Sequence, residues 1–463
     1  MNIEYPLSAL FLDSGGGWTS GKENSFILFR NPELSLSFNG RIATINMPGK
    51  RLDFSRDPLS ILEGYLSEGY FAAGYLGYEF SRFTQEGFLP VREKGGELLG
   101  SGVAIKRGGS DEQGLSAGIN QESHSKCQSV ALTHRNCGSW GTTPVMYFLF
   151  FSEEDMVLGD IENLRHLIQI PHQEYSHPEK LGDPYSNMSK GEYIDMVKRA
   201  KSYIENGDVY QVNLSQRFTV PFKSSPLAYF LDLYDVQPVP FGCYMDFGGF
   251  QLISGSMELF LRKTGRKLFT KPIKGTRKRG FTDEADAILR AELVSSEKER
   301  AENLMIVDLM RNDLGRVCKY GTVRVNKLFD IESYSTLHQM VSEVEGHLRD
   351  GVKTSDIIKS AFPPGSVTGA PKRRALEIID ELEPHLRGPY CGALGILSPD
   401  GDFTLSVAIR VLVSREGSRS VMSGAEGTFW VGGGIVWDSD PEKEYEETLV
   451  KARAIKKALG MAE

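Results

Sequence analysis

A lysine between an apolar residue and a glycine is the first position in this chain that could carry out chemistry. Lys274 lies in the segment 271–280 (KPIKGTRKRG), in which five of the ten residues are basic although the chain as a whole is acidic. The glycine lets a ligand approach the backbone closely, and a partly desolvated lysine has a lowered pKa, so it can act as a nucleophile or a base. We therefore treat Lys274 as a candidate catalytic residue, whereas Arg277, Lys278 and Arg279 fit a solvated basic loop equally well.

Two pairs of glutamates are candidates for binding a metal ion. Glu299 and Glu302 lie in a predicted helical stretch, Thr282–Leu314, and Glu444 and Glu447 lie in a second predicted helix. Residues three apart share one face of a helix, and two such faces could bind a hard cation such as Mg²⁺ through carboxylate oxygens. The alternative for each pair is a charged stripe that faces solvent. The apolar segment that follows Glu302 argues against this alternative for the first pair.

Three further segments could bind an anionic ligand. The segment Phe362–Lys372 (FPPGSVTGAPK) is a turn leading into a helix near Pro371, whose free N–H groups could bind a carboxylate, or it is a plain loop. Three glycines in 430–436 (WVGGGIV) imply close approach of a ligand or another strand. Arg410 interrupts an apolar run in the predicted strand Thr404–Val413. A buried arginine needs an anionic partner, either a substrate carboxylate or one of the glutamates.

The elements that must position these residues alternate between strands and helices. Short apolar runs predict strands in the first third, and the Gly-, Ser-, Gln- and Asn-rich stretch 95–143 predicts an irregular surface insertion. Apolar spacing near 3.6 predicts a helix over 188–206, followed by an alternating strand, Val209–Phe218. Strands that follow strands, with helices between the groups, indicate an α+β fold with antiparallel sheets. No GxGxxG follows a strand, which disfavours a doubly wound nucleotide-binding fold.

Composition excludes several classes of protein. The chain has 463 residues, with 53 Lys and Arg against 61 Asp and Glu, so its net charge is 53 − 61 = −8. An acidic chain is not typical of a general nucleic-acid binder. Five scattered cysteines suggest neither a zinc site nor a disulfide framework. The N-terminus does not resemble a signal peptide, and no apolar run approaches the ~20 residues of a membrane span. We therefore expect a cytoplasmic protein that binds neither nucleic acid nor membrane.

Together these segments resemble the chorismate-utilising enzymes, the family of anthranilate synthase component I, isochorismate synthase and aminodeoxychorismate synthase component I. The matching strings, in family order over roughly 190–460, are GDVYQVNLSQRF, PIKGT, ERAENLMIVDLMRNDLGR, FPPGSVTGAPK, YCGALGIL, IRVLV and GGGIVWDSDPEKEYEETLVKARA. The resemblance implies an anthranilate synthase component I-like fold of two packed antiparallel β-sheets flanked by helices, with interleaved subdomains. It also implies an N-terminal region over 1–150 and a chorismate-binding catalytic domain over 185–463.

The resemblance gives Lys274 and Glu258 catalytic roles. Anthranilate synthases resemble PIAGT where this chain has PIKGT, whereas aminodeoxychorismate synthases and the water-adding members carry lysine. Lys274 is then the nucleophile that attacks C2 of chorismate and expels the 4-hydroxyl, before ammonia attacks C4 and releases the lysine. Glu258 matches the general acid that protonates the leaving hydroxyl. The family usually has Pro before this glutamate, and here the residue is Met257.

The resemblance also implies the metal and substrate ligands. Glu302 and Glu447 match Mg²⁺ ligands, and Glu299 and Glu444 would complete the site directly or through water. Arg410 would bind the enolpyruvyl carboxylate of the chorismate dianion. The positions that match substrate-contacting residues are Thr276, Ser366, Tyr390, Arg410, Gly432, Gly434 and Lys451. The positions that loosely match the family's tryptophan pocket, which could bind tryptophan, are Ser14, Pro240, Phe241 and Gly242.

One departure from the family pattern bears on the product. Members that eliminate pyruvate typically have a histidine two residues before the Val-Ser of a segment like 338–342 (HQMVS), and here that register falls on Gln339, with His338 one place earlier. This favours a product that keeps its enolpyruvyl group, 4-amino-4-deoxychorismate, unless a bulge brings His338 into place. No cysteine lies in a glycine-flanked nucleophile elbow, and residues 1–463 are expected to leave no space for a glutaminase domain. Ammonia would then come from a separate glutamine amidotransferase subunit in a heterodimer, or from solution.

Three alternatives remain open from the sequence. Anthranilate synthase component I would release pyruvate. An isochorismate or salicylate synthase would add water in place of ammonia. A protein that binds chorismate or tryptophan without turnover is the most distant alternative, because the lysine, the general acid and the four glutamates are all present.

Overall fold

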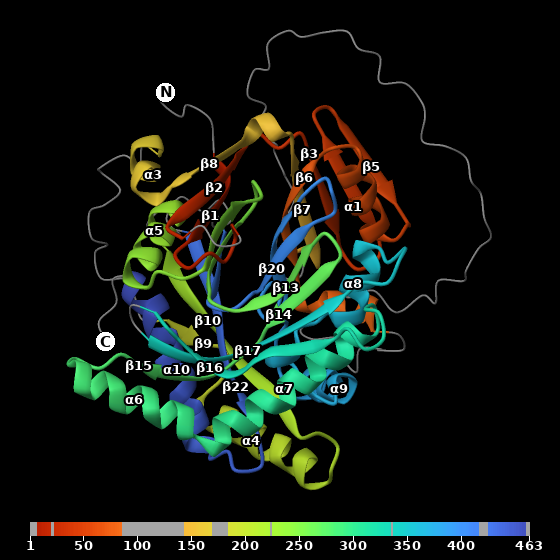
Figure 1. Ribbon diagram of the computed structural model, residues 1–463. Helices are drawn as coiled ribbons and strands as arrows, with labels where there is room; N and C mark the ends of the chain where they lie inside the picture. Colours follow the sequence, from red (N-terminus) through yellow and green to blue (C-terminus); the bar gives the residue numbers. More distant parts are fainter. Residues whose placement is uncertain are drawn as a thin grey trace.

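The protein folds into two large antiparallel sheets with helices on their outer faces, as the computed structural model in Figure 1 shows. The structure describes residues 7–19, 23–85, 143–168, 184–222, 225–334, 337–415 and 425–459. The predicted α+β class with antiparallel sheets is confirmed. Most of the predicted insertion at 95–143 lies outside the described residues. No helix in these ranges is long and apolar enough to cross a membrane.

The first sheet has ten strands, and it carries the glycine-rich strand and the strand predicted at 209–218. Along the sheet their order is β18, β10, β22, β21, β12, β11, β1, β2 and β8, with β9 paired to β10. Their bounds are β1 Leu7–Asp13, β2 Ser25–Arg30, β8 Met156–Asp160, β9 Tyr185–Ser186, β10 Gln211–Phe222, β11 Phe241–Asp246, β12 Gln251–Ser256, β18 Gly369–Ala370, β21 Val411–Arg415 and β22 Ala425–Ile435.

The second sheet has twelve strands, and it carries Lys274. The order is β15, β17, β14, β13, β20, β19, β6, β7, β3, β4 and β5, with β16 paired to β17. The bounds are β3 Leu34–Phe38, β4 Ala43–Met47, β5 Lys50–Phe54, β6 Phe71–Leu76, β7 Met146–Phe151, β13 Leu259–Thr264, β14 Lys267–Lys271, β15 Ile273–Lys278, β16 Arg324–Ser333, β17 Leu337–His347, β19 Ala393–Leu397 and β20 Phe403–Val407.

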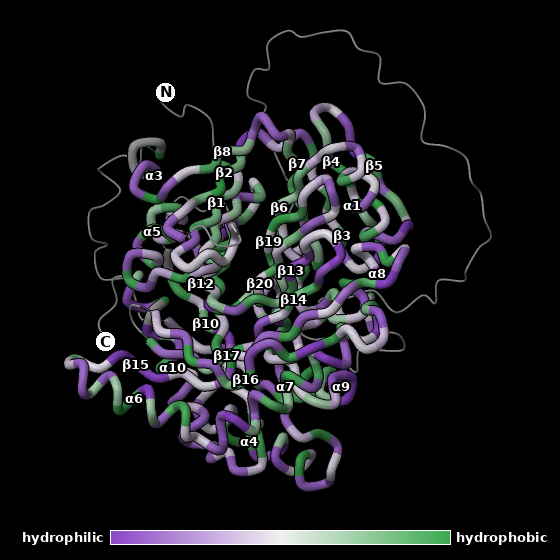
Figure 2. The backbone as a smooth tube through the Cα atoms, in the orientation of Figure 1, coloured by the Kyte–Doolittle hydropathy of each residue, from purple (hydrophilic) through white to green (hydrophobic). Residues whose placement is uncertain are grey.

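The two regions predicted at 1–150 and 185–463 share both sheets. From the first region, β1 and β2 extend the ten-stranded sheet beside β11, whereas β3 to β7 extend the twelve-stranded sheet beside β19. The subdomains are therefore interleaved. Figure 2 shows hydrophobic residues along the strands where the sheets face one another, and hydrophilic residues on the outer helices. One large cluster of buried apolar residues includes members of both sheets, such as Phe11 and Phe148.

Ten α-helices occur in the described part of the chain, and two of them carry the glutamate pairs. Helices α6 and α7 pack on β15 to β17, and α10 packs on β22. The bounds are α1 Pro58–Ser67, α2 Ser81–Thr84, α3 Ile161–Leu167, α4 Lys190–Glu205, α5 Pro226–Val236, α6 Asp283–Ser295, α7 Glu297–Gly315, α8 Thr354–Ala361, α9 Lys372–Leu382 and α10 Pro441–Ala458.

Two predicted elements are broken in the structure. The single helix predicted over 282–314 is two helices, because Ser296 leaves the helical conformation (φ −68°, ψ 105°) and its hydroxyl accepts the N–H of Glu299 as an N-cap. The strand predicted over 404–413 is also two, β20 and β21. Between them Arg410 has a positive φ of 51°, which interrupts the pleat.

Candidate active site

Lys274 lies on β15 where that strand bulges. The pairing of β15 with β17 shifts register between Ile273 and Thr276, and Gly275 between them has φ +85°. The side chain of Lys274 is 12% exposed, and its Nζ lies 4.0 Å from a carboxylate oxygen of Glu302 on α7. A Cβ atom at Gly275 would lie 3.1 Å from the carboxyl group of Glu299, so this glycine also lets α7 pack against the strand.

Glu258 lies in the short connection between β12 and β13, and its side chain is buried. Burial raises the pKa of Glu258 to about 7, because desolvation outweighs the hydrogen bond from Ser366, the charge of Lys274 and the N–H of Ile273. Ser366 is itself buried in the Gly365–Val367 turn of the FPPGSVTGAPK segment. The structure therefore brings together the predicted acid, the predicted nucleophile and one predicted substrate contact.

Gln211 is a site residue that the sequence analysis missed. Its side chain is fully buried, and in the part of the chain that the structure describes neither its amide nitrogen nor its amide oxygen has a hydrogen-bond partner. A Cβ atom at Gly434 would lie 2.7 Å from this amide nitrogen and 3.4 Å from Lys274 Nζ, so the three residues meet. A buried amide normally has a partner, and one without a partner beside a candidate nucleophile is suited to receive a ligand. Only the register of β10 against β22 shows that Gln211 approaches Gly434.

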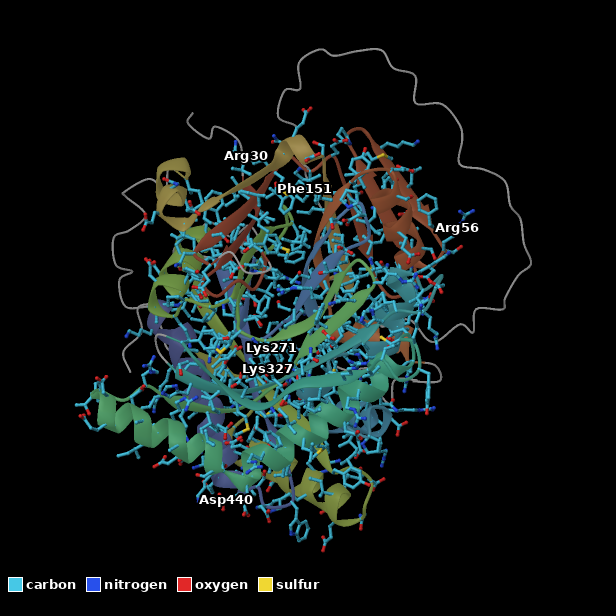
Figure 3. All side chains as sticks on the ribbon, in the orientation of Figure 1. Arg30, Arg56, Phe151, Lys271, Lys327 and Asp440 are labelled. Atoms are coloured by element: carbon cyan, nitrogen blue, oxygen red, sulfur yellow. The ribbon has the colours of Figure 1, made fainter. Side chains whose placement is uncertain are left out.

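The four glutamates lie on α7 and α10 as predicted, with lysines among them. Figure 3 marks Lys271, three residues before Lys274, and Asp440, whose carboxylate accepts the N–H of Lys443 and caps α10. Burial raises the pKa of Glu302, and so do the negative charges of Glu299 and Glu447, whereas Lys274 and Lys298 oppose the shift. Lys298 is a second residue that the sequence analysis missed, and its Nζ lies 3.9 Å from Glu302.

The pair on α10 is divided between a buried and an exposed residue. Glu444 is buried and accepts a hydrogen bond from Ser439 at 2.7 Å. Burial raises the pKa of Glu444, and the charge of Glu447 adds to the effect. Glu447 is about half exposed and pairs with Lys451 at 2.7 Å, which lowers its pKa. Lys451 also donates to the carbonyl oxygen of Gly432 at 3.0 Å.

These carboxylates fit a hard divalent cation in chemistry. They come from two helices and they are oxygen donors. Burial is the largest cause of the raised pKa of Glu302 and of Glu444, and the negative charge of Glu447 adds to both shifts, which a cation would relieve. Within the described ranges no three acidic, histidine or cysteine side chains already converge tightly enough to hold a metal ion. The glutamates would therefore have to close together around one, displacing the lysines that now interleave them.

Arg410 is a partly buried cation that has no acidic partner among the described residues. It lies between β20 and β21, and its guanidinium donates to the side-chain oxygen of Gln237. Burial lowers the pKa of Arg410 to about 10, and no carboxylate among the described residues opposes that effect. Of the two partners expected from the sequence, an internal glutamate is therefore not the one found.

The remaining predicted substrate positions have different surroundings. Tyr390 is buried and stacks on Trp430, with ring centroids 6.2 Å apart. Thr276 is exposed two residues after Lys274. Gly432 differs from Gly434, because a Cβ atom there would lie 2.4 Å from the carbonyl oxygen of Leu214 on β10. The absence of a side chain at Gly432 is thus needed for strand packing, whereas at Gly434 it leaves room beside Lys274.

The structure distinguishes His338 from Gln339. The ring of His338 turns toward α6, where Asp286 lies 3.0 Å from Nε2, and its Nδ1 lies 2.7 Å from the Ser333 hydroxyl. Gln339 points to the other face of β17, where it contacts the sulfur of Met257, the neighbour of Glu258. Its amide oxygen is buried and has no partner among the described residues. No bulge brings His338 to the site side.

Two of the residues predicted to form a tryptophan pocket, Phe241 and Gly242, contact a tryptophan of the chain itself. The indole of Trp18 is 5% exposed and donates to the carbonyl oxygen of Gly242 at 3.0 Å. Its ring meets that of Phe241 edge to face at 5.2 Å. The N–H of Ser14 donates to Val239 at 3.3 Å, next to Pro240.

Comparisons with known proteins agree with this architecture. A family profile described as chorismate binding enzyme matches residues 8–457. Anthranilate synthase component I from Streptococcus pneumoniae TIGR4 superposes with a TM-score of 0.72 and 27% identity, covering 94% of this chain and 92% of that structure. The predicted anthranilate synthase component I-like fold is thereby confirmed.

Curated relatives carry two different names. Anthranilate synthase component 1 of Aquifex aeolicus is 48% identical over 278 residues, which is 60% of this chain and 55% of the relative. Aminodeoxychorismate synthase component 1 of Bacillus subtilis is 44% identical over 286 residues, 62% of this chain and 59% of the relative. The matched segment thus spans little more than half of these relatives.

Proposed function

Since the chain belongs to the chorismate-binding enzyme family, we propose that it is an aminodeoxychorismate synthase component I. It would convert chorismate and ammonia to 4-amino-4-deoxychorismate in the cytoplasm, as a step toward p-aminobenzoate and folate. The "component 1" in the relatives' names supports a separate amidotransferase subunit as the source of ammonia.

The observation that carries this proposal is the position of Lys274. Its amine lies beside Gly434, with the buried acid Glu258 close enough for the two charges to interact. A nucleophile and an acid in one buried place suit a substitution in which one group attacks as another leaves. The lysine is also the feature that separates this chain from sequences resembling PIAGT.

In the first step, the neutral amine of Lys274 attacks C2 of chorismate. The two ring double bonds shift from C1=C2 and C5=C6 to C1=C6 and C4=C5, the bond from C4 to the hydroxyl breaks, and Glu258 supplies the proton with which this hydroxyl leaves as water. A pKa of about 7 leaves a large fraction of Glu258 protonated near neutral pH, which suits a general acid.

In the second step, ammonia attacks C4 and both ring double bonds shift back to C1=C2 and C5=C6. The bond from C2 to Lys274 breaks and the lysine regains its free amine. One proton of the ammonia nitrogen returns to Glu258 through solvent. The balance is chorismate plus ammonia giving 4-amino-4-deoxychorismate plus water, and the enzyme ends unchanged.

Binding of the dianionic substrate rests on two groups of residues. Arg410 is partly buried, has no acidic partner in the part of the chain that the structure describes, and offers a bidentate match to the enolpyruvyl carboxylate. Glu302 and Glu447, with Glu299 and Glu444, would hold Mg²⁺, which when bound would neutralise the ring carboxylate. Retention of the enolpyruvyl group is supported by Gln339, an amide with no basic nitrogen, on the site side of β17.

The test is product analysis with chorismate, Mg²⁺ and ammonium. We expect 4-amino-4-deoxychorismate by mass, and we expect Lys274→Ala to lose at least about 10³-fold in this product, because the covalent route is removed. Lys274→Ala should remain folded by circular dichroism. Wild-type turnover in that variant would exclude the covalent mechanism, and a hydrated product alone would indicate a water-adding enzyme.

Anthranilate synthase component I is the second candidate, and the names of several relatives support it. It differs in a readily measured product, since it releases pyruvate. A coupled lactate dehydrogenase assay that detects one pyruvate per chorismate consumed would favour anthranilate synthase and exclude the first proposal.

A further inference from the structure

We propose that Gln237 is a positioning residue that aims Arg410 at the substrate carboxylate while leaving its charge unneutralised. The inference rests on the proposed function, because it presumes that Arg410 binds a carboxylate of chorismate. It adds a residue outside every motif that the sequence analysis identified.

The backbone of Arg410 is held in place independently of its side chain. Its φ of 51° is uncommon for a residue with a Cβ atom, and its carbonyl oxygen accepts the N–H of Gly255 on β12 at 3.1 Å. Ser254 next to it binds the carbonyl oxygen of Ile409 at 3.0 Å. The base of the arginine is thus fixed, and what remains to be set is the direction of a long, flexible side chain.

Gln237 supplies that direction from a second fixed point. It is the C-cap of α5, its N–H donates to Leu233 at 3.0 Å, and its side chain is buried. Pro238 follows and restricts the backbone, and Val239 accepts the N–H of Ser14. The amide oxygen of Gln237 accepts from the Arg410 guanidinium.

The choice of an amide rather than a carboxylate matters here. A neutral acceptor orients the guanidinium but leaves its positive charge for a ligand. A glutamate at this position would form a buried ion pair, and such pairs are held strongly once both charges are desolvated. The carboxylate of a substrate would then have to displace an internal one.

In Gln237→Glu the affinity for chorismate and the stability of the fold should change in opposite directions. We expect the KM for chorismate to rise roughly tenfold or more, because the substrate carboxylate would have to displace an internal carboxylate from the guanidinium. The kcat at saturation should stay near that of the wild type, since the reacting groups are elsewhere. The melting temperature should equal or exceed that of the wild type, because the partly buried Arg410 gains a carboxylate in place of an amide. Gln237→Met, of similar volume and without an acceptor, should raise KM less.

Two controls make the result specific. Asn39→Asp adds the same charge in an exposed turn of the other sheet and keeps the acceptor for the N–H groups of Arg41 and Ile42, so its KM should not change. In an Arg410→Met background, Gln237→Glu should have no further effect on chorismate binding measured by calorimetry, because the effect acts through the arginine.

The results of these experiments distinguish the role of Gln237 from the role of Arg410. A folded Gln237→Glu protein with wild-type KM would overturn the inference, and if this variant does not fold, wild-type KM in Gln237→Met would do so. If Arg410→Met itself binds chorismate as tightly as the wild type, the role of Arg410 in the proposed function fails instead. Loss of kcat at unchanged KM in Gln237→Glu would also contradict a positioning role.

Discussion

At the scale of single residues, the site is marked by polar side chains that burial leaves in unfavourable states. Within the described ranges the buried amide of Gln211 has no partner and the partly buried cation of Arg410 has no acid, and Glu258 is a carboxyl group with a pKa raised to about 7. Each state costs folding free energy that an apolar side chain would not cost. A polar, anionic ligand that hydrogen-bonds to these three side chains would explain all three states.

The stability cost of a buried carboxyl group can be measured at Glu258. Its carboxyl titrates near 4.5 in the unfolded chain and near 7 in the folded protein. A raised folded pKa stabilises the protein fully below pH 4.5, and this stabilisation is lost as pH rises through 7. The difference corresponds to about 3 kcal/mol. At pH 8 the free energy of unfolding of Glu258→Gln should therefore exceed that of the wild type by up to this amount. At pH 4 the two proteins should be equally stable. Urea titrations at both pH values measure the difference.

The same variant should lose activity. Removal of a general acid costs about 10²- to 10⁴-fold in kcat, and the fall of wild-type activity above pH 7 should vanish in what remains. Glu154→Gln, at an exposed position, serves as the control for loss of a charge. A Glu258→Gln protein less stable than the wild type at pH 8 would mean that the carboxylate form is favoured in the fold.

At the scale of elements, the glycines of β22 have separate roles that substitution can reveal. A Cβ atom at Gly432 would meet the backbone of β10 at 2.4 Å, whereas one at Gly434 would meet the side-chain ends of Gln211 and Lys274. Backbone cannot yield easily, so Gly432→Ala should lower the free energy of unfolding by about 1–3 kcal/mol. Gly434→Ala should cost less stability but lower kcat/KM more. Thermal melts and initial rates of both variants test this. A Gly434→Ala protein that loses more stability and less kcat/KM than Gly432→Ala would contradict the assignment.

Helices α7 and α10 make a second prediction, about the metal. Magnesium that binds between them should stabilise the folded protein, by about 2.7 kcal/mol at a hundredfold excess over Kd. Glu302→Gln and Glu447→Gln should each weaken Mg²⁺ binding about tenfold or more in calorimetry, because each removes an anionic oxygen ligand. Glu292→Gln, on the exposed face of α6, should leave it unchanged. Equal affinities in all three variants would place the cation elsewhere.

Much at this scale could be predicted from periodicity and caps. Helix α4 begins and ends within two residues of its prediction, and the glutamate pairs do share helix faces. The break at Ser296 has a local cause, a serine that caps the N–H of Glu299, and the helical spacing on both sides of it concealed this signal.

The break at Arg410 could not be predicted, because its backbone carbonyl is bound by Gly255 of another strand. Gln211 was missed for a related reason. In a strand that alternates, nothing local distinguishes it from its neighbours, and only the pairing of Asn213 with Gly434 brings it beside the lysine.

At the scale of the whole molecule, the site depends on an interleaved fold. Lys274 and Glu302 belong to the twelve-stranded sheet and its helices, whereas Gln211, Gly434 and Glu447 belong to the ten-stranded sheet and its helices. Both sheets also contain strands from the first 85 residues. A catalytic fragment without those strands would expose one edge of each sheet, so the site is a product of the entire chain. The net charge of −8 likewise describes the whole and not the site, where lysines and Arg410 supply positive charge for a dianion.

The source of nitrogen is a prediction about the molecule as a unit. Among the described residues no cysteine is exposed, since Cys243, Cys318 and Cys391 are all buried, and burial raises the pKa of the Cys243 and Cys391 thiols. An activated cysteine needs the opposite conditions. The chain alone should therefore form product from chorismate with ammonium, in proportion to the concentration of free ammonia at a fixed pH, and should form none with glutamine. Adding a glutamine amidotransferase subunit should make glutamine a substrate, measured by glutamate release coupled to product. Glutamine use by the purified chain alone would show that it contains an amidase, and would contradict the dependence on a partner.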